Sequence, residues 1–151
     1  MKLWKVTTLA CAAALVTASV VSAAELDPLK PRVPPADMAA AKADKNPIPM
    51  SPESIEKGKE LFTGDLGCNG CHGDGGTGDG PASAGLEPSP RNFTNPKWQA
   101  ARTDGELKYT DFKGSNGPDF STPTAMIANE AMYEDPNDVW DVINYIRSLK
   151  K

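Results

Sequence analysis

The sequence predicts an all-α domain, and three observations support this. Near the C-terminus, apolar side chains recur with the helical period, at Val139, Val142, Ile143, Ile146 and Leu149. Two earlier segments begin with helix-capping patterns, at Ser51 and at Thr103. No strand signal rises above these patterns anywhere in the chain. We therefore expect three to five helices in one domain over residues 51–151.

Residues 1–24 have the composition of a secretory signal peptide. Lys2 and Lys5 give a basic start, residues 6–21 carry no charge, and small residues occupy the cleavage positions after Val21. Cleavage would also remove Cys11 and leave two cysteines in the exported chain. The alternative is an uncleaved anchor helix, since residues 6–24 are nearly long enough to span a bilayer. Their Ala, Thr and Ser content makes them weakly hydrophobic, which favours cleavage and no stable membrane insertion afterwards.

Residues 25–50 are rich in proline and alanine. A stretch of this kind buries little surface by itself and is typical of an extended arm or linker. Residues 36–43 contain enough alanine for a short helix. The composition leaves two alternatives open, a spacer or an arm that wraps around the domain.

The first helix of the domain is expected from Ser51 to Thr63. Ser51 is a candidate N-cap, and the proline that follows it suits the first turn. Ile55, Gly58 and Phe62 fall on one helix face. A glycine within that apolar face would let another helix cross closely, and Gly64 follows the predicted end.

Two further helices follow later in the chain. The capping-box pattern Thr103–Glu106 starts a helix that reaches about Lys113 and is closed by Gly114. The last helix has Asp135 as its predicted N-cap and Pro136 in its first position. Its apolar stripe faces the core, and lysines stand at its negative C-terminal end.

The segments between these helices contain many glycines and prolines. Residues 73–80 form a glycine and aspartate loop, which lacks the lysine of a phosphate-binding loop and the spacing of a calcium-binding EF-hand. We interpret it as a tight turn. Residues 81–98 contain three further prolines after Pro81 and are predicted to be mostly irregular.

The pentapeptide Cys68-Asn69-Gly70-Cys71-His72 carries the strongest chemical signal. C-x-x-C-H is the attachment signature of a c-type haem. Two thiols one helical turn apart can each add to a vinyl group of the same porphyrin, and the histidine then lies beneath the iron as a ligand. The chain has one histidine and no second C-x-x-C pair, so we expect one covalent haem c.

Three other interpretations of the pentapeptide fit less well. A structural zinc site uses four ligands, whereas Cys68, Cys71 and His72 supply three. A thioredoxin-like redox pair requires a βαβ context, and no β-rich run flanks the site. A disulfide between the two cysteines would close a loop too small to stabilise the fold much.

The charge of the chain restricts its partners. It has 16 basic and 20 acidic residues, a net charge of −4, and loss of Lys2 and Lys5 with the signal makes it two units more negative. This argues against nucleic acid and anionic membranes as partners. It is compatible with docking onto a redox partner that has a basic patch, and equally with acidity that serves only solubility.

The order of these segments resembles a class I c-type cytochrome, a small bacterial periplasmic protein with one haem, over residues 51–151. The matching pieces are residues 58–62, 68–73, 78–81, 90–93, 103–107 and 138–149, together with a methionine in a late loop. The resemblance implies the cytochrome c fold and a periplasmic location. It also implies a close crossing of the first and last helices, with Gly58 and Phe62 against Trp140 or Tyr145.

The second iron ligand implied by the resemblance is a loop methionine. Met126 and Met132 are the two methionines that follow the haem motif. Met126 lies in an irregular segment at the family's usual distance before the last helix, so we predict Met126 as the ligand. Met132 is expected to pack in the core.

Other haem contacts are also implied by the resemblance. A metal-bound histidine donates its other ring N–H to an acceptor, and the family pattern assigns this role to the backbone carbonyl of Pro81. Arg91 is the candidate for a haem propionate, with Trp98 as a possible partner. A solvated surface role for Arg91 and plain packing for Trp98 are the alternatives.

Two function classes remain. A six-coordinate haem with histidine and methionine ligands suits a one-electron carrier that shuttles between a redox donor and an acceptor, and this is the function we expect. A fixed haem subunit of a larger redox complex is a variant of that chemistry. A five-coordinate haem enzyme or sensor would need an open distal pocket and a polar group, and no second histidine exists to provide one.

Overall fold

The computed structural model describes residue 27, residues 29–120 and residues 123–151. Its six α-helices are α1 (Met38–Ala43), α2 (Pro52–Thr63), α3 (Asn69–His72), α4 (Pro96–Ala101), α5 (Asp104–Lys113) and α6 (Val139–Ser148). Two short 3₁₀ turns, Glu130–Met132 and Pro136–Asp138, precede α6. No strand occurs in these ranges, so the all-α prediction is confirmed, and five of the α-helices lie within residues 51–151. The predicted signal peptide, residues 1–24, lies outside the described residues.

The capping signals mark the observed helix starts. The Ser51 hydroxyl accepts a hydrogen bond from the Ser54 N–H at 3.2 Å, and Thr103 and Glu106 form a complete capping box. Asp135 caps a 3₁₀ turn rather than the α-helix, so α6 begins three residues later than expected. The α4 helix was not predicted, although Asn95 caps it through bonds from two backbone N–H groups.

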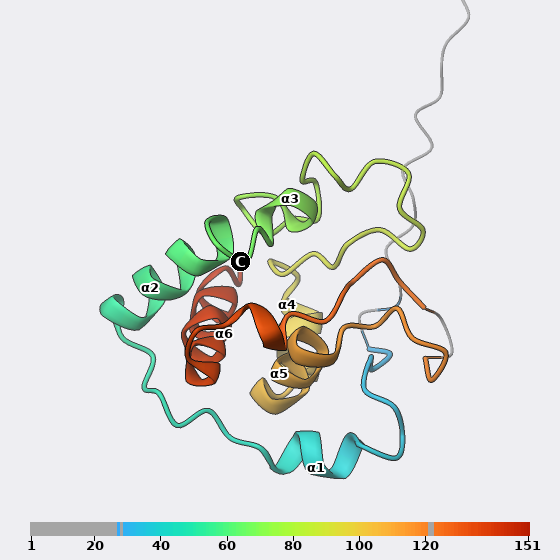
Figure 1. Ribbon diagram of the computed structural model, residues 1–151, viewed down its shortest axis with the longest axis horizontal. Helices are drawn as coiled ribbons and strands as arrows, with labels where there is room; N and C mark the ends of the chain where they lie inside the picture. Colours follow the sequence, from blue (N-terminus) through green and yellow to red (C-terminus); the bar gives the residue numbers. More distant parts are fainter. Residues whose placement is uncertain (1–26, 28, 121–122) are drawn as a thin grey trace, which may run out of the picture.

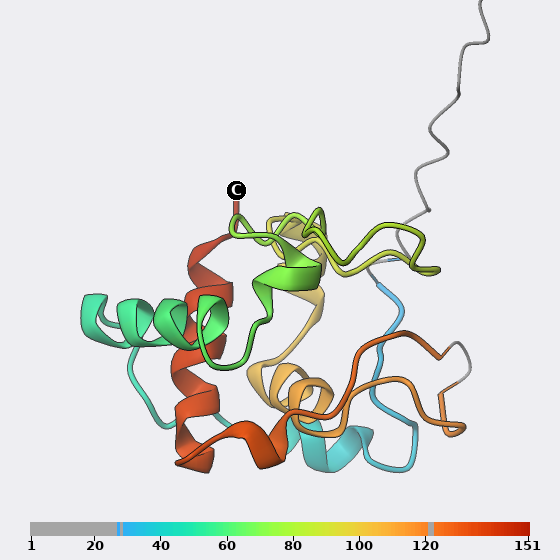
Figure 2. The same ribbon diagram turned by 45° about the horizontal axis from the view of Figure 1, so that its top comes forward.

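The α2 and α6 helices cross closely at Gly58 (Figures 1 and 2). A β-carbon on Gly58 would lie 2.0 Å from the backbone oxygen of Asp141. Phe62 meets Tyr145 edge-on beside the crossing, with ring centroids 5.2 Å apart. The predicted contact between the terminal helices is therefore confirmed, with Tyr145 as the aromatic partner of Phe62.

The core follows the predicted apolar stripe of the last helix. Val139, Val142 and Ile143 are almost completely buried, while Ile146 and Leu149 pack at the core's edge. The prediction that Met132 packs in the core is wrong, because its side chain is 44% exposed in the 3₁₀ turn. Among the described residues, no helix combines the length and apolar character needed to cross a membrane.

The proline-rich arm packs against the domain instead of extending from it. Its helix α1 lies beneath α5 in both ribbon views, so closely that a β-carbon on Gly105 would lie 2.0 Å from the Ala41 carbonyl oxygen. Val33 and Ala41 are buried, at 5% and 6% exposure. Of the two alternatives, the structure therefore has an arm that wraps around the domain.

Candidate haem site

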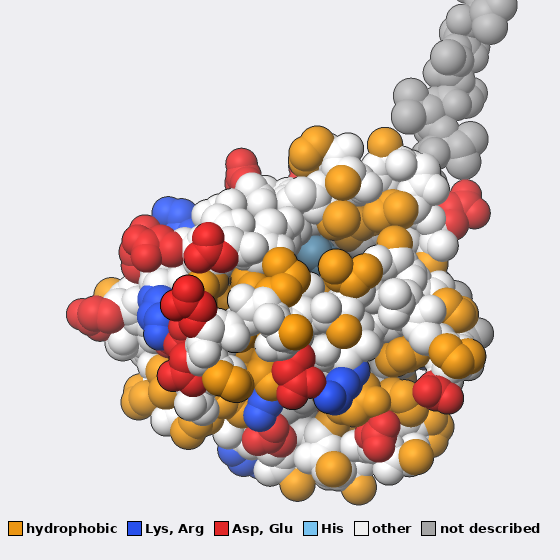
Figure 3. Space-filling view, viewed as in Figure 1, with side chains coloured by type: hydrophobic (Ala, Val, Ile, Leu, Met, Phe, Trp, Pro, Cys, Tyr) orange, Lys and Arg blue, Asp and Glu red, His pale blue; other side chains and the backbone are white. Residues whose placement is uncertain are grey.

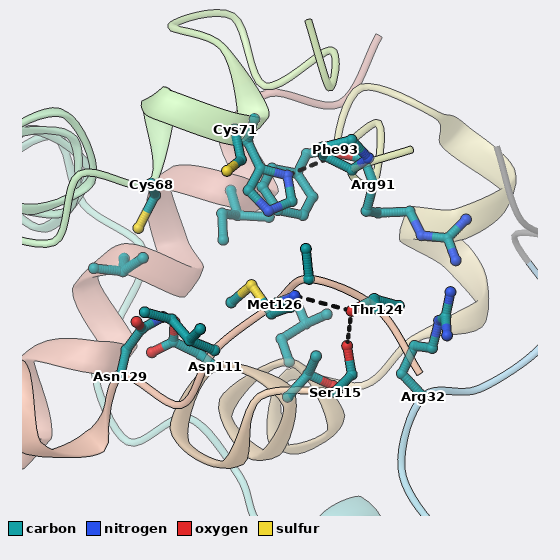
Figure 4. A pocket seen from close by; sticks show the side chains of 18 of the residues that line it. Arg32, Cys68, Cys71, Arg91, Phe93, Asp111, Ser115, Thr124, Met126 and Asn129 are labelled. Atoms are coloured by element: carbon teal, nitrogen blue, oxygen red, sulfur yellow. Dashed lines mark hydrogen bonds between the residues drawn. The ribbon is translucent and has the colours of Figure 1, made fainter. Parts of the chain in front are cut away.

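The short helix α3 carries Cys71 and His72, and Cys68 is its N-cap residue. The His72 N–H donates to the Cys68 carbonyl at 2.9 Å, which sets Cys68 and Cys71 one helical turn apart. Both are free thiols, and Figure 4 shows their sulfur atoms directed into a cavity. His72 lines the same cavity. One wall of the cavity therefore presents two thiols and an imidazole.

Hydrogen bonding fixes the tautomer of His72. Its Nδ1 lies 3.0 Å from the Arg91 backbone oxygen, and since a carbonyl can only accept, Nδ1 carries the proton. The pKa of His72 is lowered to about 4, mainly because the ring is buried; the hydrogen bond to the Arg91 carbonyl opposes this shift, and the positive charge of Arg91 adds to it. The imidazole is therefore neutral at physiological pH, with a free lone pair on Nε2.

An aromatic stack supports the imidazole from behind. Phe93 lies parallel to the His72 ring, with centroids 4.3 Å apart and an interplanar angle of 17°. Trp98 packs against Phe93 at 5.2 Å, and its side chain is 5% exposed. Because these rings are themselves packed in the core, they hold the imidazole plane in one orientation.

The opposite wall of the cavity is formed by the loop that carries Met126 (Figure 4). The loop is attached to the end of α5: the Ser115 N–H donates to the Met126 carbonyl at 2.9 Å, and the Thr124 N–H donates to the Ser115 carbonyl at 2.8 Å. The Met126 N–H in turn donates to the Thr124 hydroxyl at 3.0 Å. These bonds fix the backbone of Met126 while its thioether faces the cavity.

A buried polar group borders the cavity near Cys68. Asp111 accepts hydrogen bonds from the Tyr133 hydroxyl at 2.6 Å and from the Asn129 amide at 2.9 Å. Burial raises the pKa of Asp111, and these two hydrogen bonds act against that rise. Burial, followed by the charge of Asp111, raises the pKa of the Cys68 thiol to about 12. The Cys68 sulfur is thus uncharged at neutral pH.

Comparison with known proteins shows which family the chain belongs to. The family model described as cytochrome c matches residues 55–150, which is more than half of the chain. The chain belongs to the cytochrome c family. A search of the curated proteins found no match for it.

Two solved structures resemble this cytochrome. One is a chain of the Kuenenia stuttgartiensis reducing HAO-like protein complex Kustc0457/Kustc0458, with 24% identity and a TM-score of 0.58. The match covers 70% of the cytochrome but 47% of that chain, so the cytochrome spans about half of its length. The other is the KustC0563 c-type cytochrome, with 23% identity and a TM-score of 0.46 over 62% of the cytochrome and 98% of that chain. The first likeness supports the fold.

The residues of the cavity fit the covalent haem c that the family implies. Two thiols with the C-x-x-C spacing and a neutral imidazole with a free Nε2 stand on one wall. A thioether faces them from the other wall, and apolar side chains such as Leu107 and Val142 also line the cavity. In addition, the Nε atom of Arg102, another lining residue, is buried without a hydrogen-bond partner among the described residues. That donor would suit an acidic group of the cofactor.

The structure corrects one predicted role. The acceptor of the His72 N–H is the carbonyl of Arg91, and Pro81 is exposed. The glycine loop folds back on α3, since the Gly78 N–H donates to the His72 carbonyl at 2.8 Å. The chain then returns and passes the imidazole ten residues after Pro81, so Arg91 supplies the carbonyl.

The remaining predicted residues lie where they could serve the haem. Arg91 and Trp98 both line the cavity, as do Met126 and the three residues of the motif. Met126 as iron ligand and Arg91 and Trp98 as propionate contacts stay predictions. Sequence reasoning missed two arginines that also line the cavity, Arg32 of the arm and Arg102, which comes just before the N-cap of α5. No spacing or motif distinguishes either arginine in the sequence.

Proposed function

We propose that this cytochrome is a periplasmic one-electron carrier with a single haem c, attached through Cys68 and Cys71 and held between His72 and Met126. The proposal rests on one observation: the candidate iron ligands lie on two walls of the cavity that face each other. Helix α3 and its N-cap residue Cys68 contribute the thiols and the imidazole, and the Met126 loop faces them (Figure 4). The same chain can thus supply a ligand to each face of the iron.

The two ligands define what the site would do. Bound haem would supply a reversible one-electron iron couple, and methionine with histidine raises its reduction potential. His72 would bind through Nε2 while the Arg91 carbonyl holds its Nδ1 proton. Met126 would supply the second protein ligand to the iron, and with both ligands bound no site would be left for a substrate. Electron transfer, rather than catalysis on bound substrate, is therefore the function that this arrangement supports.

The surface offers a route for the electron. In Figure 3 the single histidine of the chain is visible within a hollow whose rim is largely hydrophobic. Acidic side chains gather to one side of the hollow, over α2 in the same view. We propose that a donor and an acceptor approach this hollow in turn, and that at least one of them presents basic groups to the acidic region. Long-range charge would then steer docking, and apolar contact at the rim would complete it.

The experiment that tests the proposal is expression with export and haem-attachment machinery, followed by denaturation in acid acetone. We expect haem to stay with the polypeptide, and an absorption spectrum with the weak near-infrared band of methionine-ligated ferric iron. Cys71→Ala should leave one thioether or an unstable apoprotein. Haem that is released into the solvent would refute covalent attachment. A ferrous wild-type protein that binds CO readily would refute the six-coordinate carrier and favour an enzyme or sensor.

A second measurement separates a free carrier from a fixed subunit. The chain of the reducing HAO-like complex to which the cytochrome is similar belongs to a larger assembly by its description. We expect the native cytochrome to elute from a sizing column as a protein of its own mass. Stable co-elution with other redox proteins would replace the free carrier with a complex subunit.

A further inference from the structure

One end of the cavity is lined by arginines from three different segments. Arg32 belongs to the N-terminal arm, Arg91 follows the proline-rich loop, and Arg102 follows α4. Figure 4 shows the side chains of Arg32 and Arg91 together on the side of the cavity away from Cys68. The cavity is therefore polarised, with the thiols at one end and positive charge at the other.

Arg102 brings a buried hydrogen-bond donor, its Nε–H, to this end of the cavity. Its side chain is 10% exposed, and its two terminal nitrogens donate to Glu106 at 2.9 Å and to the Leu29 carbonyl at 2.5 Å. Its Nε is buried and has no partner in the part of the chain that the structure describes. A buried donor without an acceptor is costly, because it has lost its hydrogen bonds to water and gained none in return. An acceptor that enters the cavity would remove that cost.

The fold holds Arg32 in place through the contacts of the arm. The Tyr109 hydroxyl donates to Asp37 at 2.6 Å, and Lys108 pairs with Asp44 at 3.0 Å. Val33, the neighbour of Arg32, is 5% exposed. The burial of Val33 and the contacts of Asp37 and Asp44 hold the arm against the domain. They therefore fix the position of the Arg32 backbone beside the cavity.

We propose that residues 29–46 of the arm are part of the haem site, where Arg32 joins Arg91 and Arg102 to bind the haem propionates. This inference rests on the proposed haem function. The Arg102–Glu106 pair is neutral as a unit, and Arg32, Arg91 and Lys30 make this end of the cavity positive, opposite in charge to the two carboxylates. Guanidinium groups bind carboxylates through paired, charge-assisted hydrogen bonds. Residues that lie before the family match at 55–150 would then complete the cofactor site.

The charge balance agrees with this assignment. Burial lowers the pKa of Arg32, and the positive charge of Arg91 lowers it further. Two guanidinium groups that repel each other in a partly desolvated cavity are both stabilised when an anion lies between them. Glu106 and Lys30 are the other charged side chains that line this end, and Glu106 is already paired with Arg102.

The test is the pH dependence of the reduction potential of the haem-loaded protein. The variants are Arg32→Gln and Lys42→Gln, which each remove one positive charge from the arm; Lys42 is exposed and does not line the cavity. Loss of a cation beside a carboxylate raises the carboxylate pKa by about 1–3 units. In a plot of reduction potential against pH, the inflection marks the carboxylate pKa, and we expect Arg32→Gln to shift it to higher pH by about 1–3 units. We also expect Arg32→Gln to lower the reduction potential, because removal of a positive charge stabilises the oxidised haem relative to the reduced haem.

Lys42→Gln should behave as the wild type does. Superimposable curves for Arg32→Gln and the wild type, both carrying covalent haem, would refute the role of the arm and leave the carrier function standing. A wild type without covalent haem would refute the carrier function before any variant is compared. If Arg32→Gln does not accumulate with haem, Arg32→Lys decides. If Arg32→Lys binds haem and its potential has the wild-type inflection, the proposal is supported. If Arg32→Lys also fails to accumulate with haem while Lys42→Gln behaves normally, the proposal is overturned.

Discussion

Gly58 offers the sharpest test of the fold, through the substitution Gly58→Ala. A β-carbon at this position would lie 2.0 Å from the Asp141 carbonyl oxygen, 2.4 Å from its carbon and 2.9 Å from the Val142 nitrogen. All three atoms belong to the backbone of α6, so no side-chain rotation can relieve the overlap. The helices themselves must separate, and the packing beside the crossing must change with them.

The structure sets the sign and size of the effect. At an open helical site, alanine is more favourable than glycine by about 1 kcal/mol. Ordinary contact begins at 3.4 Å, so here α6 must retreat by about 1.4 Å. A gap of about 0.5–1 Å already loses a quarter to a half of the dispersion energy between facing atoms. With the cost of overpacking, we expect a net loss of about 1–3 kcal/mol.

Thermal unfolding of the haem-loaded protein, followed by far-ultraviolet circular dichroism, measures this loss. The melting temperature should fall by about 4–8 °C for each kcal/mol in a domain of this size. Gly75→Ala is the matched control, because a β-carbon on Gly75 meets nothing within 4 Å. A Gly58→Ala protein that melts at or above the wild-type temperature would contradict the close crossing of α2 and α6.

Three further predictions address the ligand, the buried polar contacts and the surface charge. Met126→Ala should convert the ferrous protein into one that binds CO readily and should lower its potential, whereas Met132→Ala, at an exposed side chain, should leave the spectrum unchanged. Asn144 is 3% exposed and donates to the Ser54 hydroxyl at 2.8 Å, so Asn144→Ala should cost about 1–3 kcal/mol in urea unfolding. Asn137→Ala, at an exposed site, should change stability by less than about 0.5 kcal/mol. Stopped-flow electron transfer to a basic partner should slow as salt is added, and a salt-independent rate would remove the steering argument.

The helices that could be predicted are those whose signals are local. An N-cap such as Ser51 binds a backbone N–H three residues later, so the sequence contains both partners of the contact. The Thr103 capping box has the same property. The apolar stripe of α6 is also local, because its period alone decides which side faces inward. The missed α4 had a local signal too, in Asn95 followed by proline, but the surrounding prolines outweighed it.

The contacts that could not be predicted depend on where distant segments meet. Pro81 and Arg91 both follow the haem motif, and only the return path of the loop decides which carbonyl reaches His72. The position of Met132 depends on the 3₁₀ turn before α6 rather than on its own apolar character. The burial of Val33 in the arm depends on a complementary surface of the domain, which composition does not encode.

The same distinction explains why one wall of the haem site is evident from the sequence while the rest is not. Cys68, the N-cap of α3, and Cys71 and His72 within α3 lie within about one helical turn, because covalent chemistry on a single cofactor demands that spacing. The charged end has no such constraint: Arg32 and Arg102 are 70 residues apart in the numbering and converge only because α1 packs under α5. Each contact of the arm is a single side-chain interaction of modest strength. Together these contacts confine Arg32. The packing of the whole arm therefore positions this cation beside the cavity, and a search for sequence motifs cannot detect such packing.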